Sequence, residues 1–313
     1  MKLVLLDADT LGADLDLSPL ERFGELEIYD FTAPDETAER IAGSDVVLTN
    51  KVILDRALME AAPSLKLICI TATGMNNVDL EAAQELGIEV KNVAGYSTRS
   101  VAQHTFAMTL YLMEKMGYYS SYAQGGAWSQ SPTFTHLEQP FHEIAGKRWG
   151  IIGMGTIGQQ VARIAEAFGA EVVYHSTSGA NTDQPWTHLD LDEMLRTSDI
   201  VSIHAPLGDR TRDLLGAGNL PLLKEGAILI NVGRGGIVDE AVLAAELDRR
   251  EIYAGLDVTE TEPIPPYNPL LHIRHTERLL LTPHIAWGSI ESRHKLLEGV
   301  VKNIEEWIAP TPS

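Results

Sequence analysis

A glycine-rich segment in this chain of 313 residues is the first candidate for binding chemistry. It reads Gly153-Met154-Gly155-Thr156-Ile157-Gly158, with the spacing G-x-G-x-x-G. An apolar run at 149–152, typical of a strand, precedes it, and a helical pattern at 157–168 follows. In that setting the first glycine permits a tight turn, the second lets the backbone approach a pyrophosphate, and the third allows close helix–strand packing. The N-terminus of the helix has a positive partial charge and unpaired N–H groups, which bind phosphate. The segment therefore predicts a dinucleotide site rather than an ordinary glycine-rich turn.

The end of the next predicted strand, at 171–175, bears on which dinucleotide would bind. An acidic side chain is expected there to hold the adenosine ribose, but the strand runs into Ser176 and Thr177 with no carboxylate. An aspartate at this point would repel a 2′-phosphate, whereas Ser176 does not. No arginine lies between Arg163 and Arg196 to bind such a phosphate tightly. The choice between NAD(H) and NADP(H) therefore stays open, and residues 176–178 also read as a plain polar turn.

The scaffold for these segments is predicted from short β-branched runs that alternate with amphipathic stretches. Such alternation indicates βαβ units and parallel sheets. We predict an α/β fold of two Rossmann-like, doubly wound parallel-sheet domains with the active-site cleft between them. The predicted strands are 2–6, 26–29, 45–49, 65–71, 88–91, 149–152, 171–175, 200–204, 227–232, 253–258 and 279–282. The predicted helices are 35–41, 56–61, 79–86, 157–168, 191–197, 220–223 and 240–249.

The connection between the two predicted domains contains a helix and a long loop. Residues 97–117 repeat apolar side chains at helical spacing and predict one long helix. The loop at 125–142 carries Trp128, Phe134 and Phe141. Three large aromatic side chains favour packing on a partner subunit or on the other domain over exposure to solvent.

The last predicted helix, at 289–308, leads the chain back toward the first domain. We therefore predict a discontinuous substrate-binding domain, 1–98 plus 287–313, and an NAD(P)-binding domain, 99–286. This division places the glycine-rich segment in the second domain.

Charge and cysteine content argue against several kinds of partner. The chain has 24 Lys+Arg against 44 Asp+Glu, a formal net charge of −20, which disfavours nucleic acid and anionic membrane. No uncharged apolar run is long enough for a membrane span. Cys69 is the only cysteine, which excludes an internal disulfide and fits a cytoplasmic location. An anionic substrate would need local positive charge.

Several segments, in the same order along the chain, resemble the D-isomer-specific 2-hydroxyacid dehydrogenases. Asn50-Lys51, the pair Asn76-Asn77 and Trp287 are most similar to the glycerate dehydrogenases, also called hydroxypyruvate reductases, within that family. Besides the glycine-rich segment, the matching segments are TATGMNNVDL at 71–80, YSTRSVAQHTFA at 96–107, HAPL at 204–207 with Thr211, NVGRGGIVDE at 231–240, LDVTETEP at 256–263 and PHIAW at 283–287.

The resemblance implies a catalytic triad of Arg234, Glu262 and His284. Reduction of a 2-keto acid needs a proton donor that titrates near neutrality, which suits His284. A carboxylate on the imidazole, here Glu262, would fix its tautomer and stabilise its charged form. The guanidinium of Arg234 would bind the substrate carboxylate and polarise the keto oxygen. All three follow predicted strands at their carboxyl ends, where open parallel sheets bind ligands.

The resemblance also assigns contacts around the triad. Asp257 would meet the nicotinamide carboxamide, and the first predicted domain would hold the substrate carboxylate. His272 and His275, spaced H-x-x-H, lack a partnered acid or cysteine, and we expect no metal site. The further cofactor contacts expected are Thr98, His204, Ala205, Pro206, Thr211, Val232 and Gly233. The substrate contacts expected are Asn50, Lys51, the backbone N–H groups of Thr73, Gly74 and Met75, and Tyr96, Trp287 and Arg234.

The sequence thus predicts an NAD(P)-dependent oxidoreductase that acts on CH–OH donors. It would reduce a small 2-keto acid such as hydroxypyruvate or glyoxylate, or oxidise a D-2-hydroxy acid in reverse. A short form of 3-phosphoglycerate dehydrogenase and a dinucleotide-sensing protein without turnover are the alternatives. A homodimer is expected because a two-fold pair is the commonest closed assembly.

Overall fold

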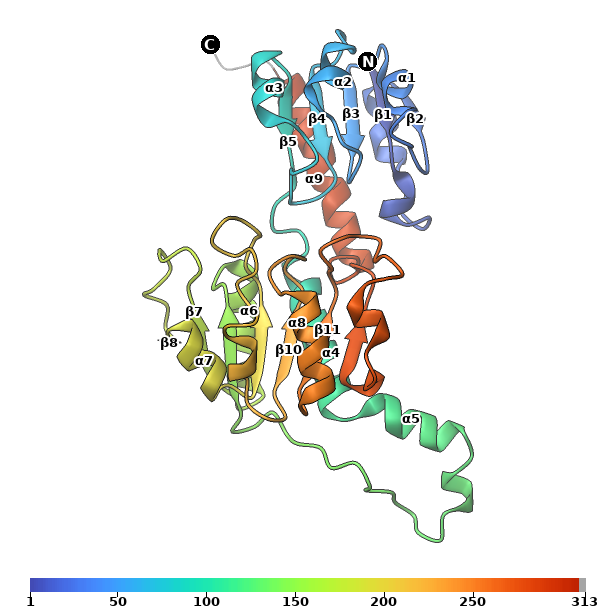
Figure 1. Ribbon diagram of the computed structural model, residues 1–313. Helices are drawn as coiled ribbons and strands as arrows, with labels where there is room; N and C mark the ends of the chain where they lie inside the picture. Colours follow the sequence, from blue (N-terminus) through green and yellow to red (C-terminus); the bar gives the residue numbers. More distant parts are fainter. Residues whose placement is uncertain (310–313) are drawn as a thin grey trace. The chain divides into compact units, whose positions relative to one another are not determined.

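The computed structural model describes residues 1–309, which form two compact units. Unit 1 comprises Met1–Ser97 together with the chain from Gly288 onward, and unit 2 is Thr98–Trp287. Each contains one parallel sheet with helices on its faces, which confirms the predicted fold class of two doubly wound α/β domains (Figure 1).

Unit 1 is built on a five-stranded parallel sheet in the order β2-β1-β3-β4-β5. The order reverses at β1, as in other doubly wound sheets. The strands are β1 Lys2–Leu5, β2 Glu25–Ile28, β3 Val46–Thr49, β4 Leu67–Ile70 and β5 Glu89–Lys91. The helices are α1 Thr37–Ile41, α2 Arg56–Glu60, α3 Leu80–Glu85 and α9 Ile290–Ile308, with 3-10 turns η1 Ala8–Leu11 and η2 Ser18–Phe23.

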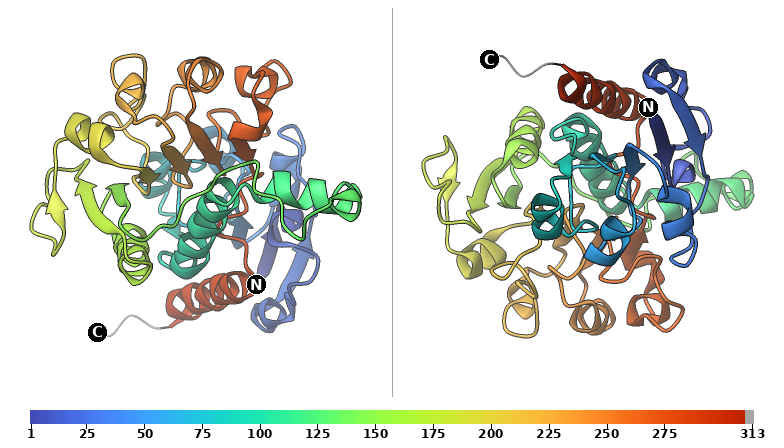
Figure 2. Two further views of the ribbon diagram at one scale, coloured as in Figure 1. Left: turned by 90° about the horizontal axis from the view of Figure 1, so that it is seen from below. Right: turned by 90° about the horizontal axis from the view of Figure 1, so that it is seen from above.

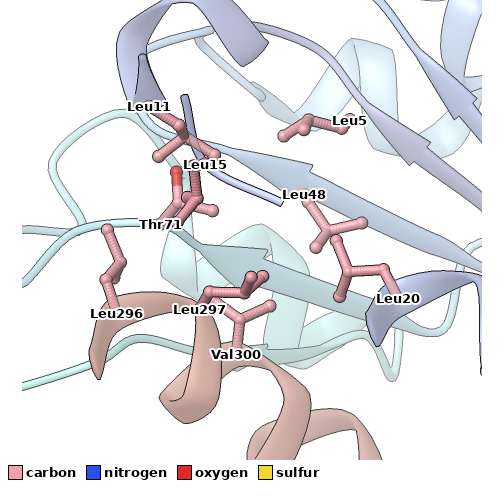
Figure 3. Close-up of a pocket in the computed structure, with 9 residues that line it drawn as sticks. All are labelled: Leu5, Leu11, Leu15, Leu20, Leu48, Thr71, Leu296, Leu297 and Val300. Carbon is pink, nitrogen blue, oxygen red and sulfur yellow. The ribbon is translucent and has the colours of Figure 1, made fainter. Parts of the chain in front are cut away.

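Alternating side chains of these strands supply two apolar layers in unit 1. Val4, Val47 and Ile68 pack on one face with residues of α1, α2 and α3. On the other face Leu5 and Leu48 meet Leu296 of α9 around a small apolar pocket (Figure 3), so α9 belongs to the core of this unit although it is distant in sequence. The other side chains that line the pocket are Leu11, Leu15, Leu20, Thr71, Leu297 and Val300.

Unit 2 contains a seven-stranded parallel sheet in the order β12-β11-β10-β9-β6-β7-β8. The order reverses between β6 and β9, and ligands bind outside the carboxyl ends of the strands at such a point. The strands are β6 Arg148–Ile152, β7 Glu171–His175, β8 Thr187–His188, β9 Ile200–Ile203, β10 Ile228–Asn231, β11 Tyr253–Leu256 and β12 Leu279–Leu281. The helices are α4 Thr98–Met113, α6 Thr156–Ala167, α7 Leu191–Thr197 and α8 Glu240–Arg249, with 3-10 turns η4 Leu220–Leu222, η5 Pro269–His272 and η6 Thr276–Arg278.

Helices cover both faces of this sheet (Figure 2). Trp149 and Tyr174 are fully buried in the layer under α4 and α6. Leu195 of α7 and Leu243 of α8 belong to a second apolar cluster, on the opposite face. Both faces of the central strands are therefore buried among apolar side chains, so polar side chains can gather only at the strand ends.

The prediction of one helix over residues 97–117 is wrong at its end. Helix α4 stops at Met113, and a second helix, α5 Met116–Gln124, begins after Lys115, whose φ of 54° is left-handed. The ammonium of Lys115 lies 3.3 Å from the ring centroid of Tyr253, a cation–π contact that accompanies the break. Burial lowers the pKa of Lys115.

Helix α5 opens an arm that leaves the α/β body of unit 2 and returns as a loop to β6 (Figure 1). After α5 the arm continues through the 3-10 turn η3 Trp128–Gln130. Within the arm, Tyr122 stacks on His136 at 3.7 Å between ring centroids, while Trp128, Phe134 and Phe141 are exposed. The arm thus has internal order but leaves three large aromatic side chains exposed within the unit.

Candidate active site

The polar residues singled out in unit 2 gather at the carboxyl end of its sheet. The strands are parallel and in register, so every loop that follows a strand emerges at this one edge. Arg234 follows β10, Glu262 follows β11 and His284 follows β12. Ser176 and Thr177 follow β7, whereas His204, Ala205 and Pro206 follow β9.

The glycine-rich segment forms the turn from β6 into α6. Gly153 has a φ of +92°, and a Cβ there would lie 2.8 Å from the backbone N of Ala205. A Cβ at Gly158 would lie 2.2 Å from the Gly153 carbonyl oxygen, whereas one at Gly155 would meet nothing within 4 Å. The first and third glycines thus let the chain pack tightly, and the second leaves space above the N-terminus of α6. This geometry fits a dinucleotide pyrophosphate.

His284 and Glu262 lie in direct contact. Nδ1 of His284 is 2.7 Å from Oε2 of Glu262, and both side chains are partly exposed. The backbone N–H of Thr259 donates to the other carboxylate oxygen, Oε1, at 3.2 Å. Because Nδ1 is occupied by the carboxylate, Nε2 is the imidazole nitrogen that can exchange a proton with another molecule.

Asp257 holds the backbone that carries His284. Its carboxylate accepts from the N–H groups of Ile285 at 2.9 Å and Ala286 at 2.8 Å, and from the Thr282 hydroxyl at 2.6 Å. His284 itself has a left-handed φ of 54°, a strained conformation that persists only when its surroundings hold it. Asp257, which is 1% exposed, supplies that support, a role that sequence reasoning did not assign to it.

Thr282 in turn links this network to α4. His104 lies with Nε2 3.1 Å from the Thr282 hydroxyl and 3.6 Å from the Asp257 carboxylate. Thr98 is the first residue of the same helix. Sequence reasoning missed Thr282, and the only signal for it is its place directly before Pro283 and His284.

The loop that presents Arg234 is fastened by Asn231, the last residue of β10. Its side chain accepts from the Gly233 N–H at 3.0 Å and donates to the Arg234 carbonyl at 2.9 Å. A Cβ at Gly235 would lie 1.9 Å from the Thr259 carbonyl oxygen, so only glycine lets this loop approach the loop that bears Glu262. Val232 is buried beneath the loop, and the guanidinium Nη1 donates to the Gly233 carbonyl at 2.8 Å.

His204 is neutral at the end of β9. Burial lowers its pKa to about 3. Its Nε2 is 3.0 Å from the Ser202 hydroxyl, which also accepts from the Trp149 indole N–H at 2.9 Å. Thr211 closes the same loop, because its hydroxyl donates to the Pro206 carbonyl at 2.7 Å. The predicted cofactor contacts His204, Ala205, Pro206 and Thr211 are therefore uncharged and lie in a loop that these hydrogen bonds hold together.

The turn after β7 is contacted by an arginine from another loop, which sequence reasoning missed. Arg210, from the loop after β9, donates from Nη1 to the Ser178 carbonyl at 2.9 Å. The two residues are 32 positions apart in the sequence, and a search confined to residues near the strand end could not find this contact. Beside them, the Ser176 hydroxyl is buried without a hydrogen-bond partner among residues 1–309.

In unit 1 the expected substrate residues also follow strands at the carboxyl edge. Asn50 and Lys51 follow β3, and their N–H groups donate to the buried carboxylate of Asp7 at distances from 2.7 to 3.0 Å. Asp7 follows β1 and was not singled out from the sequence, although it lies directly after an apolar run. It fastens the ends of β1 and β3 together.

The turn after β4 contains Thr73, Gly74 and Met75. The Thr73 hydroxyl donates to the Val93 carbonyl at 3.1 Å, which ties the turn to the chain beyond β5. Tyr96 is half-buried near the end of the same unit, and Trp287 is half-buried at the end of unit 2. The structure thus places Asn50, Lys51 and the 73–75 turn at one sheet edge of unit 1.

Two further features concern metals and membranes. Among residues 1–309, no three His, Cys, Asp or Glu side chains are grouped to hold a metal ion. His272 instead lies 2.8 Å from the Pro266 carbonyl, and His275 lies 3.3 Å from Glu277. In the same range of residues, no helix combines the length and apolar character that a membrane crossing needs.

Comparison with known proteins gives a consistent family. The model of the D-isomer specific 2-hydroxyacid dehydrogenase NAD binding domain matches residues 106–286. A hydroxypyruvate reductase of Blautia hydrogenotrophica is 36% identical over 319 residues, covering 100% of this chain and 98% of that protein. A glycerate dehydrogenase of Methylorubrum extorquens is 34% identical over 313 residues, covering 99% and 97%. An acyclic imino acid reductase solved with NADPH and D-Arg superposes with a TM-score of 0.86 at 29% identity, covering 100% and 98%.

Proposed function

This chain belongs to the D-isomer-specific 2-hydroxyacid dehydrogenases and is an NAD(P)-linked oxidoreductase acting on CH–OH donors, and we propose that it reduces hydroxypyruvate or glyoxylate. The relatives that carry these substrate names cover nearly the whole chain. The observation that carries the proposal is the contact of 2.7 Å between Nδ1 of His284 and Glu262. It leaves Nε2 of a carboxylate-paired imidazole as a proton donor at the sheet edge that also bears Arg234 and the glycine-rich turn.

Each residue of the triad has a separate task in this proposal. A nicotinamide dinucleotide, when bound to unit 2, would supply the hydride chemistry at carbon 2 of the substrate. His284 gives the proton on Nε2 to the keto oxygen as that oxygen gains negative charge, while Glu262 stabilises the imidazolium before transfer. Arg234 holds the substrate carboxylate and polarises the keto group through its planar fork of donors. In the reverse direction His284 takes the hydroxyl proton from a D-2-hydroxy acid.

The remaining contacts divide between the two units. Unit 2 would hold the dinucleotide through the turn at 153–158, the loops at 204–211 and 232–233, and Ser176, Thr177, Thr98 and Asp257. Unit 1 would bind the substrate through Asn50, Lys51 and the backbone donors at 73–75, with Tyr96 and, from unit 2, Trp287 limiting its size. Lys51 would supply the local positive charge that a net charge of −20 makes necessary.

Initial rates test the proposal. Hydroxypyruvate, glyoxylate, pyruvate and phenylpyruvate would each be offered with NADH and with NADPH, to the native chain and to Arg234→Ala. We expect fast turnover of hydroxypyruvate or glyoxylate, and a large loss of kcat/KM in the variant. If every keto acid stays unreduced while dinucleotide binding is intact, the reductase proposal fails and a dinucleotide-sensing role replaces it.

We also propose that the chain is a homodimer and that its compartment is the cytoplasm. The arm formed by α5 and residues 125–143 exposes Trp128, Phe134 and Leu137, which a second copy would cover. The buried thiol of Cys69, the only cysteine, suits a reducing compartment. Light scattering at micromolar concentration tests the assembly, and a monomeric mass would contradict it.

A further inference from the structure

The end of β7 is polar but carries no negative charge. His175, Ser176 and Thr177 stand where a ribose-binding carboxylate would be expected. The Ser176 hydroxyl is buried and has no hydrogen-bond partner among the described residues. A buried hydroxyl without a partner costs free energy, and a phosphate oxygen bound at this turn would supply the missing partner.

Arg210 brings positive charge to this turn from another loop. One of its guanidinium donors, Nη1, is held 2.9 Å from the Ser178 carbonyl. Arg210 is exposed, and so is Ser178. A guanidinium has five N–H donors in a planar fork, so this anchor leaves donors that can bind a phosphate in two-point fashion. This hydrogen bond holds the Arg210 side chain beside the turn.

His188 completes the surroundings of the turn. Its ring stacks near that of His175, with 6.1 Å between centroids and 16° between planes, and its Nε2 is 3.4 Å from the Ser176 backbone N. These rings are neutral or positive, and they add no repulsion toward a phosphate. In a chain with a net charge of −20, residues 175–178 carry no carboxylate and are contacted by an anchored arginine.

We propose that Arg210 and the Ser176 hydroxyl form a subsite for the 2′-phosphate of NADP(H), so that this chain prefers NADP(H) over NAD(H). The inference rests on the proposed function only in that a dinucleotide occupies unit 2. When a dinucleotide lies on the turn at 153–158, the 2′ position of its adenosine ribose is directed toward the end of β7, the second strand of unit 2 along the chain. Because no carboxylate stands at the end of β7, the 2′-phosphate of NADP(H) is not repelled there. The guanidinium of Arg210 would attract it.

Binding of two adenosine fragments tests the subsite without turnover. Isothermal titration would compare adenosine 2′,5′-bisphosphate with adenosine 5′-monophosphate on the native chain and on Arg210→Gln. We expect the native chain to bind the bisphosphate at least about tenfold more tightly, which corresponds to one strong charge-assisted contact. Arg210→Gln should lose most of that preference while its Kd for the monophosphate stays unchanged.

Three further variants test whether the effect is specific to this site. Arg196→Gln removes an exposed arginine of α7 that pairs with Asp192 at 3.4 Å, and it should keep the native preference. Ser176→Asp should reverse the preference toward the monophosphate, because a carboxylate repels the phosphate and binds the ribose hydroxyls. Thermal melting checks that each variant is folded. Arg210→Lys provides a second replacement that retains charge but not the fork.

The outcomes separate this inference from the proposed function. Equal affinity of the native chain for the two fragments, or an undiminished preference in folded Arg210→Gln, would overturn the subsite. Binding of neither fragment would overturn both the subsite and the dinucleotide site. A clear preference for the bisphosphate without reduction of any keto acid would leave the subsite standing and remove only the reductase proposal.

Discussion

The carboxyl ends of the two parallel sheets carry different kinds of group. In unit 2 this edge presents charged side chains, and the His284–Glu262 pair is formed within the unit itself. In unit 1 the corresponding edge is organised by one buried carboxylate, Asp7, that accepts from backbone N–H groups. One edge therefore has the groups for proton transfer, and the other has a fixed backbone shape.

Under the proposed function, the difference would let one type of sheet serve two tasks. Proton transfer needs a side chain held in one orientation, and Asp257 of unit 2 fixes residues 285 and 286 around His284. Recognition of a small anion needs only donors at fixed positions, which backbone N–H groups and a lysine can provide. From this contrast we expect changes in unit 2 to lower kcat and changes in unit 1 to alter stability or KM.

The largest expected effect is on His284. His284→Ala should lower kcat by about 10²–10⁴-fold with a smaller change in KM, because the general acid is lost. Glu262→Gln should lower kcat less, since the imidazole remains. Steady-state rates measure both, and His272→Ala, which removes an exposed histidine, serves as the control. A native kcat in His284→Ala would contradict the assignment of the chemistry to this edge.

Asp7→Ala should be the most damaging change at the edge of unit 1. It leaves the N–H groups of Asn50 and Lys51 and the Thr49 hydroxyl without their acceptor. Each buried donor left unpaired costs about 1–3 kcal/mol, so we expect a loss of about 3 kcal/mol in the free energy of unfolding. Urea denaturation measures this loss. Asp9→Ala, at an exposed position two residues along, should be close to native.

The order of elements could be predicted because alternating β-branched and amphipathic stretches determine which segments form strands and helices. Several strands were predicted one or two residues too long, as at 253–258 against Tyr253–Leu256, because a residue beyond the strand, here Val258, is also apolar and buried. The break at Lys115 could not be predicted, since a left-handed lysine leaves no mark on helical periodicity.

The candidate site was predictable only in part, for a related reason. Arg234, Glu262 and His284 came from a family resemblance, since their spacing alone does not place them together. Asp7 meets Lys51 across 44 positions, and Arg210 meets Ser178 across 32. Contacts of this kind depend on which strands are neighbours, and the strand order within a sheet is a property of the folded chain.

The third effect concerns pH and His204 in unit 2. Burial lowers its pKa from 6.5 to about 3, so the folded chain keeps it neutral while the unfolded chain takes up a proton below pH 6.5. The resulting stabilisation is complete above pH 6.5 and declines as the pH falls toward 3. At pH 5 the native chain should have lost about 2 kcal/mol of unfolding free energy through this group.

Comparison with His204→Asn isolates that contribution. Between pH 7.5 and 5 the variant should lose less stability in chemical denaturation than the native chain, although it is less stable at pH 7.5 itself. His294→Asn, an exposed replacement in α9, should follow the native profile. Parallel profiles for the native chain and His204→Asn would show that His204 is protonated equally in both states.

The smallest expected effect separates recognition from chemistry at the edge of unit 1. Lys51→Ala should raise the KM for the keto acid about tenfold, the equivalent of one charge-assisted contact, and leave kcat nearly unchanged. Lys66→Ala, an exposed lysine that precedes β4 at the opposite end of the strands, should change neither constant. A loss of kcat in Lys51→Ala as large as that in His284→Ala would break the division of labour between the two sheets, because it would place unit 1 in the proton or hydride step.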